Sequence, residues 1–312
     1  MSTVAETATR APARAGVKRS PLRRLTRRVP FLLLVALILV YVAFPFYWAI
    51  RSAFTADSAL FNTPVQYFPA HPTLTNFREV LSSGDFQRAL INSTIVAGSV
   101  TLISIAVGAL AGYALGRFRF RGRSAALYLM LSMTIFPQIA ILGALYTMIN
   151  GLHIGFLGLD FHTPHLYNTL WALIFSYLVL TLPLTVWILT TFMRALPKDL
   201  EEAAYIDGAT PLQVFYKVML PLIAPGLVTA GLLAFITAWQ EFLYALSFTE
   251  TPDKHTVTVA ITTFTGKSGS TFQVPWGQIM AATVIVTAPL IAITLALQRR
   301  ILAGLTAGAV KG

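Results

Sequence analysis

The sequence contains no cysteine and few charged residues. Of its 312 residues, 11% are charged, and only 12 are Asp or Glu. The absence of cysteine excludes disulfides, thiolate metal sites and cysteine nucleophiles. A soluble domain carries about 25% charged residues, so this chain lacks the polar surface that contact with water requires. The chain is instead 56% hydrophobic, with a mean hydropathy of +0.69, which indicates a membrane protein.

Several apolar stretches are long enough to cross a bilayer as a helix, which takes about 20 residues. The six stretches are approximately 29–50, 89–116, 124–149, 167–193, 222–246 and 276–297. Prolines 45, 137, 183 and 289 lie inside four of them, where kinks are expected. The sequence therefore predicts an all-α membrane protein whose six transmembrane helices form one bundle.

Lysine and arginine are divided unequally between the two sides of this bundle. The two termini, the connection RFRFRGR and the stretch around residues 194–217 together hold 18, whereas the opposite connections hold five. Cytoplasmic loops carry the excess of these residues. We therefore expect both termini to be cytoplasmic, in a multi-pass membrane protein. The net charge of +11 then reflects topology and anionic lipid rather than binding to nucleic acid.

The expected organisation follows from these spans. It consists of a basic cytoplasmic tail (1–28), a first transmembrane helix (29–50), an extracytoplasmic loop (51–87), a membrane core of five helices (88–298) and a cytoplasmic C-terminal tail (299–312). All five histidines fall in the expected outer loops without an accompanying acid cluster. We expect neither a metal site nor catalytic residues.

Three glycines in the second span form two overlapping GxxxG steps on one helix face. These are Gly108, Gly112 and Gly116. Small residues at this spacing let helices approach closely in lipid. The expected role is helix packing within the bundle, and contact with a second subunit is the alternative.

Glu241, in the stretch AWQEFLYAL, is the clear acidic residue inside a predicted span. A charge at that depth is costly and should face a wet cavity or a partner. Two interpretations stay open. Gln240 and Glu241 would line a translocation pathway, or Glu241 would be a carboxylate at the rim that reaches interfacial water or bonds a backbone amide.

Residues 197–221, PKDLEEAAYIDGATPLQVFYKVMLP, interrupt the apolar pattern with charges and turn signals. Pro197 and the acids after it predict a helix start, and Gly208 predicts a left-handed helix end. Thr210 and Gln213 predict a capping box on a second helix, which Pro221 is expected to end. Helices of about nine residues are unstable alone. Docking to a cytoplasmic protein is therefore favoured over a loop lying on lipid.

This 197–221 segment resembles the EAA motif of the membrane subunits of binding-protein-dependent ABC importers. That motif is Glu-Ala-Ala, three residues, Gly, nine residues, then Ile-x-Leu-Pro. Here it reads Glu202-Ala203-Ala204, Gly208 and Val218-Met219-Leu220-Pro221, with Val replacing Ile. Asp207-Gly208-Ala209 and the closing GLTAGAVKG resemble one permease of maltose/trehalose-type sugar importers. The loop at 152–167 is longer than is usual in the family.

The resemblance implies a type I ABC importer permease of the bacterial inner membrane, with cytoplasmic coupling helices, and not an enzyme. Its implied partners are a homologous second permease, two ATPase subunits, an extracytoplasmic sugar-binding protein and the lipid bilayer. The chain itself would hold no cofactor, since ATP and Mg bind to the ATPase. The residues implied in docking to that ATPase are Glu202, Ala203, Ala204, Asp207, Gly208, Ala209, Leu220 and Pro221.

The expected activity is import of a di- or oligosaccharide similar to maltose or trehalose. The main alternative is the same machinery carrying another solute, such as glycerol phosphate, a polyamine or an amino acid. A secondary carrier would need buried ion-coupling residues and no EAA segment. A membrane scaffold without transport is a further alternative.

Overall fold

The computed structural model describes the backbone of residues 21–151, 153–156, 159–162, 164–264 and 274–309, with side chains for 29–151, 164–264 and 274–298. The chain divides into two compact units, Met1–Trp48 and Ala49–Gly312. The described part of the first unit belongs to helix α1 (Pro21–Ala53). Its stretch Val29–Ala53 has a mean hydropathy of 2.7, and 25 residues of helix exceed the length that a bilayer requires.

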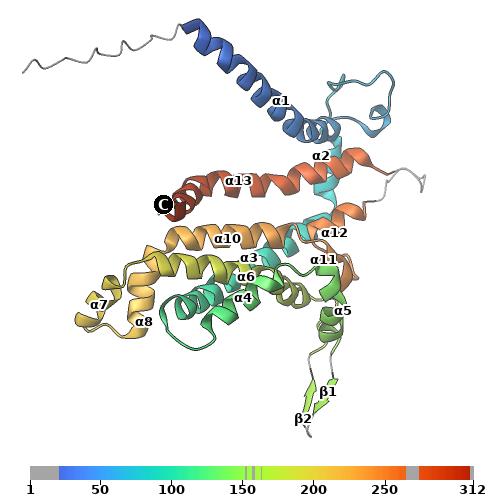
Figure 1. The fold of residues 1–312 in the computed structure, drawn as a ribbon. Helices are drawn as coiled ribbons and strands as arrows, with labels where there is room; N and C mark the ends of the chain where they lie inside the picture. The colour runs from blue at the N-terminus through green and yellow to red at the C-terminus, as the bar shows by residue number, and fades with distance from the viewer. Residues whose placement is uncertain (1–20, 152, 157–158, 163, 265–273, 310–312) are drawn as a thin grey trace, which may run out of the picture. The chain divides into compact units, whose positions relative to one another are not determined.

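The second unit is built around three helices that pack against one another, α3 (Gly84–Arg117), α6 (Leu170–Ala195) and α10 (Ala224–Trp239). Helix α13 (Trp276–Ala309) packs against α10, and α4 (Arg123–Met133) packs against α6 (Figure 1). One end of this bundle carries η1 (Asp57–Ala59), α2 (Thr75–Ser82), α5 (Gln138–Ile149), α11 (Leu243–Phe248) and α12 (Val257–Thr262). The other end carries the 197–221 segment.

Two of the long helices, α3 and α6, begin at capping residues. The Ser83 hydroxyl accepts from the backbone amide of Phe86 at the start of α3, and the Thr169 hydroxyl accepts from that of Ala172 at the start of α6. Such caps satisfy amides that have no partner within the helix. Within the described residues, four helices are long and apolar enough to cross a membrane, or up to six if two bent pairs each count as one span. The predicted all-α membrane class is confirmed.

The third predicted span, 124–149, is not one continuous helix. It consists of α4 and α5, which are bent by 100° at the break between Met133 and Gln138. Pro137 has an extended conformation there, with ψ 132°. Proline cannot donate a hydrogen bond, and it disfavours the helical conformation in the residue before it. The proline therefore separates two helices rather than kinking one.

The fifth predicted span, 222–246, is interrupted as well. Helix α10 ends at Trp239, and α11 begins at Leu243. The carboxylate of Glu241 accepts from the backbone amides of Tyr244 and Ala245, at 2.8 and 3.1 Å. Those amides would point to carbonyls of the preceding turn in a continuous helix. The glutamate thus starts a new helix instead of continuing the old one.

Two short strands accompany the helices. Strands β1 (His153–Phe156) and β2 (Leu159–His162) pair antiparallel, with His153 opposite His162. They lie in the loop that the sequence marks as unusually long for the family. Positions 152, 157, 158 and 163 of this loop are outside the described residues. The all-α expectation therefore needs one addition, a small hairpin.

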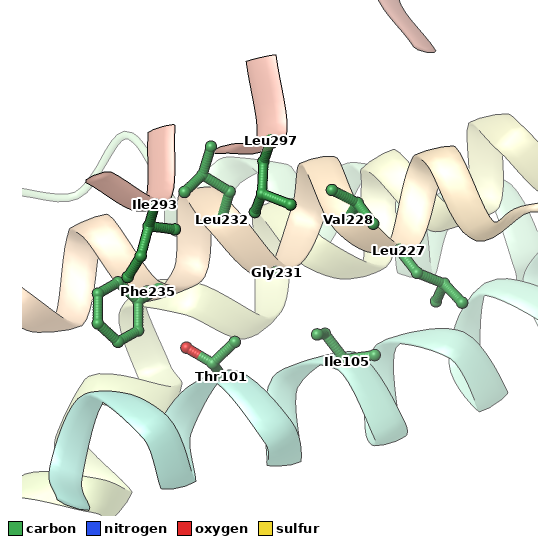
Figure 2. A pocket seen from close by; sticks show the side chains of 9 residues that line it. All are labelled: Thr101, Ile105, Leu227, Val228, Gly231, Leu232, Phe235, Ile293 and Leu297. Carbon is green, nitrogen blue, oxygen red and sulfur yellow. The ribbon is translucent and has the colours of Figure 1, made fainter. Parts of the chain in front are cut away.

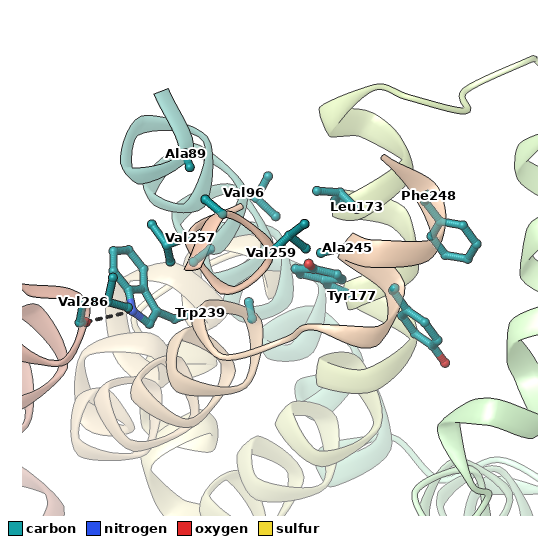
Figure 3. Packing of buried hydrophobic residues seen from close by; sticks show 14 of the residues in the cluster. Ala89, Val96, Leu173, Tyr177, Trp239, Ala245, Phe248, Val257, Val259 and Val286 are labelled. Atoms are coloured by element: carbon teal, nitrogen blue, oxygen red, sulfur yellow. Dashed lines mark hydrogen bonds between the residues drawn. The ribbon is translucent and has the colours of Figure 1, made fainter. Parts of the chain in front are cut away.

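The larger of the hydrophobic clusters joins residues of α2, α3, α5, α6, α10, α11, α12 and α13. Ala89, Leu173, Tyr177 and Val257 are among its fully buried members (Figure 3). The indole nitrogen of Trp239 donates to the carbonyl oxygen of Val286 at 3.2 Å, the bond drawn dashed in Figure 3. This cluster fixes the end of the bundle opposite the 197–221 segment.

Candidate functional site

The 197–221 segment forms two helical pieces joined by a turn. The first is α7 (Asp199–Ile206), and its first turn carries Asp199, Glu201 and Glu202. Acidic side chains are favourable there because the amide end of a helix carries positive partial charge. The second piece runs through α8 (Pro211–Gln213), a π-helical turn (Val214–Met219) and α9 (Leu220–Leu222).

Gly208 ends the first piece in the predicted left-handed conformation, with φ 80°. The amide of Gly208 donates to the carbonyl of Tyr205, and the amide of Ala209 donates to that of Ala204, both at 3.0 Å. This pair of bonds is the Schellman arrangement, which satisfies carbonyls at a helix end. The turn direction is therefore set by the backbone of the segment itself.

The predicted capping box at the start of the second piece is present. The Thr210 hydroxyl accepts from the amide of Gln213, and the Gln213 side chain accepts from the amide of Thr210 at 2.8 Å. The prediction that Pro221 ends this piece is wrong. Because Pro221 has no amide hydrogen, the turn before it widens, and the helix continues to Leu222. The chain then bends by 76° into α10.

Side chains on one face of the segment pack into the end of the bundle. Val214 and Met219 are fully buried against α3 and α6, and Ala204 and Ala209 pack against the same cluster. The ring of Phe215 lies 5.2 Å from that of Tyr113. These contacts supply the stability that such short helices lack by themselves.

Arg117, the last residue of α3, also holds the segment. Its Nε lies 2.7 Å from Oε1 of Glu201, with side-chain exposures of 5% and 15%. The sequence counts Arg117 only as a topology charge and Glu201 only as one of the acids at the start of the first helix. No local pattern indicates this pair, because the two residues are far apart in the chain and meet only in the fold.

The opposite face of the segment is exposed. Five of the residues implied in docking are exposed: Glu202, Ala203, Asp207, Gly208 and Pro221. Ile206, which is 85% exposed, and Leu212, which is 66% exposed, add apolar area. The residues implied in docking therefore divide into two groups. Ala204, Ala209 and Leu220 face the bundle, and the other five remain accessible to a partner.

The three glycines of α3 lie against α6 within the same chain. A Cβ at Gly112 would stand 3.0 Å from the backbone nitrogen of Thr190, and one at Gly116 would stand 2.8 Å from Cβ of Met193. At Gly108 the nearest atom would be a methyl carbon of Thr185, at 2.6 Å. The two helices approach closely because these positions carry no side chain.

The structure separates Gln240 from Glu241. Gln240 is exposed, whereas Glu241 is 6% exposed and caps α11 through the amides of Tyr244 and Ala245. The hydroxyl of Thr258 donates to the backbone oxygen of Glu241 at 2.7 Å. This geometry matches the expectation of a carboxylate that bonds backbone amides. Of the two residues, only Gln240 presents its side chain to a surface.

A groove of about 320 Å³ lies between α3, α10 and α13 (Figure 2). Its lining residues are Thr101, Ile105, Leu227, Val228, Gly231, Leu232, Phe235, Ile293 and Leu297. The hydroxyl of Thr101 donates a hydrogen bond to the backbone carbonyl of Ala97. Such a lining offers no polar groups for orienting a hydrophilic solute. Among the described residues, no group of three or more acidic or histidine side chains could hold a metal ion.

Comparison with known proteins shows which family this chain resembles. The model of the family "Binding-protein-dependent transport system inner membrane component" matches residues 104–306. The chain belongs to this family. It is therefore a multi-pass inner-membrane permease subunit of a transport system rather than an enzyme, and the family inferred from the EAA spacing is confirmed.

The relatives are similar over nearly their whole length. The trehalose/maltose transport system permease protein MalG of Thermococcus litoralis is 40% identical over 288 residues, which cover 92% of this chain and 98% of that protein. The trehalose transport system permease protein SugB of Mycobacterium tuberculosis is 39% identical, covering 88% and 95%. A chain of a bacterial ABC transporter that imports alginate has the same fold, with a TM-score of 0.74 at 18% identity, covering 90% and 98%.

Proposed function

We propose that this permease imports a di- or oligosaccharide of the trehalose/maltose kind, with energy from ATP hydrolysed on partner subunits. The observation that carries the proposal is a sequence identity of 40% and 39%, over most of this chain, to two permeases named for trehalose or maltose. Further relatives are named for sulfoquinovosyl glycerol and diacetylchitobiose. All four named substrates contain a glycosidic bond, which favours a sugar over a polyamine or an amino acid.

In this proposal the exposed face of the 197–221 segment docks to the ATPase subunit. Its acids, Glu202 and Asp207, suit a basic partner surface, and Ile206 and Leu212 supply apolar contact area. Interfaces combine such an apolar centre with a polar rim. The sequence pattern assigns the segment to the same side as 18 of the 23 lysines and arginines, and the excess of these residues on cytoplasmic loops supports a cytoplasmic position for the segment and for both termini.

The remaining partners follow from the same proposal. A homologous second permease would complete the membrane part, and a second ATPase copy would dock to it. An extracytoplasmic sugar-binding protein would deliver solute at the opposite end, where the β1–β2 hairpin lies. ATP and Mg would bind only to the ATPase, so this chain would hold no cofactor.

Reconstitution tests the proposal. The chain is placed in liposomes together with the second permease, the ATPase and the binding protein from the same bacterium, and uptake of labelled trehalose and maltose is measured with ATP inside. We expect ATP-dependent accumulation that excess unlabelled disaccharide abolishes. Glycerol phosphate, polyamine and amino acid should not compete. Accumulation by the single chain under a proton or sodium gradient would contradict the proposal.

A further inference from the structure

The two adjacent glutamates of the 197–221 segment have different surroundings. Glu202 is exposed, whereas the side chain of Glu201 is 15% exposed and pairs with Arg117. Nε of Arg117 and Oε1 of Glu201 lie 2.7 Å apart without forming an aligned hydrogen bond. Charge attraction therefore holds the pair. Removal of either partner would leave the other charge buried without compensation, which is strongly unfavourable.

Arg117 contacts three separate parts of the segment. Its Nη2 donates to the carbonyl oxygen of Pro197 at 3.3 Å, just before α7. Its Nε pairs with Glu201 in the first turn of α7. Its Nη2 also lies 4.0 Å from the sulfur of Met219, at the end of the π-helical turn. One guanidinium thus connects the beginning, the first helix and the last turn of the segment to the end of α3.

The position of Arg117 allows these contacts to transmit movement from the segment to α3. It is the last residue of α3, which is favourable because a cation interacts well with the carbonyl end of a helix. The chain connects the segment only to α6 and α10. Among the described residues, direct transmission to α3, which packs against both of those helices, passes through Arg117 and the neighbouring side-chain contacts of Tyr113.

We propose that Arg117 and Glu201 are positioning residues that couple the 197–221 segment to α3, so that movement of a docked ATPase displaces α3 together with α6 and α10. This inference rests on the proposed function. Neither residue needs to touch the ATPase or the solute. Loss of the pair should uncouple ATP hydrolysis from import while docking persists.

The test uses Arg117→Gln, Glu201→Gln and the double variant in the assembled, reconstituted importer. Each single variant leaves one buried charge unpaired, whereas the double variant replaces the pair with two neutral amides. We expect each single variant to raise the ATP hydrolysed per sugar imported by about tenfold or more, and the double variant to recover most of the coupling. Arg119→Gln, which removes an exposed charge two residues away, is the matched control and should behave as wild type.

Hydrogen exchange on the same complex provides a second measurement that does not depend on transport. Amides of α7 should exchange faster in the single variants than in the double variant and the control. Wild-type coupling and exchange in both single variants would overturn the proposal, as would a double variant no better than the singles. If the single variants fail to assemble, an assembled and coupled double variant supports the pair, and a failed one overturns it. Failure of docking itself is read separately, from retention of the ATPase.

Discussion

Replacing Gly208 with aspartate should leave the permease folded and yet weaken its hold on the ATPase. The φ of 80° is one at which a Cβ costs on the order of 1 kcal/mol, and Asp and Asn tolerate this region better than most residues. Among the described residues, no atom outside the immediate chain neighbours lies within 4 Å of the position that a Cβ would take. The fold should therefore lose at most about 1 kcal/mol.

The larger effect is expected at the docked surface. Gly208 is exposed between Asp207 and Ala209, at the bend between the two helical pieces. A side chain there would occupy space that the partner needs. Overfilling a packed contact costs about 1–3 kcal/mol, and 1.4 kcal/mol corresponds to about tenfold in affinity. The affinity of the Gly208→Asp variant for the ATPase should thus fall by about tenfold or more, and uptake should fall accordingly.

Gly208→Asn is the matched control, because it has nearly the same volume as aspartate and no charge. If the volume decides, both variants lose the ATPase to a similar degree. The assay is pull-down of the ATPase and of the second permease from the membranes in which uptake is measured. Full ATPase retention with wild-type uptake in Gly208→Asp would refute docking by this turn.

Three further predictions concern the bundle. Glu241→Ala leaves two buried amides without their acceptor and should cost about 1–3 kcal/mol, seen as a lower melting temperature of the purified permease, whereas Gln240→Ala should have no effect. Gly112→Val should destabilise the permease in the same assay because a Cβ meets the α6 backbone, and Gly98→Val, with open space at its Cβ position, should not. A cysteine at Arg121 should react only with reagents that reach the cytoplasm, and one at Thr63 only from outside. Labelling of position 121 in intact cells would reverse the topology.

Features set by neighbouring residues were predictable from the sequence. The turn at Gly208 and the capping box of Thr210 with Gln213 use donors and acceptors within a few residues of each other, so their spacing in the chain is sufficient. The spaced glycines of α3 likewise indicate a close helix contact, although not its partner. The spacing between the EAA residues and the later Leu-Pro identified the family for the same reason.

Features that depend on distant residues were not predictable. Glu201 and Glu202 are identical in local pattern, and only the end of α3 decides which one is buried. Glu241 shows an intermediate case. Its capping of α11 is local, but an apolar run of membrane-spanning length conceals the helix break. The proline at position 137 gave a signal of the break between α4 and α5, although the sequence did not indicate a bend of 100°.

The arrangement of contacts explains why the 197–221 segment can be both short and rigid. Its backbone sets the turn at Gly208, its buried face is fixed by the bundle, and Arg117 joins it to α3. The glycine face of α3 in turn brings the backbone of α6 close, so these two helices have little room to slide independently. In the proposed importer, a displacement at Glu202 or Gly208 would therefore reach α3 and α6 together. Enlarging Gly112 and neutralising Arg117 should then impair coupling by separate routes. Their effects should differ measurably, because only the change at Gly112 loosens the packing of α3 against α6.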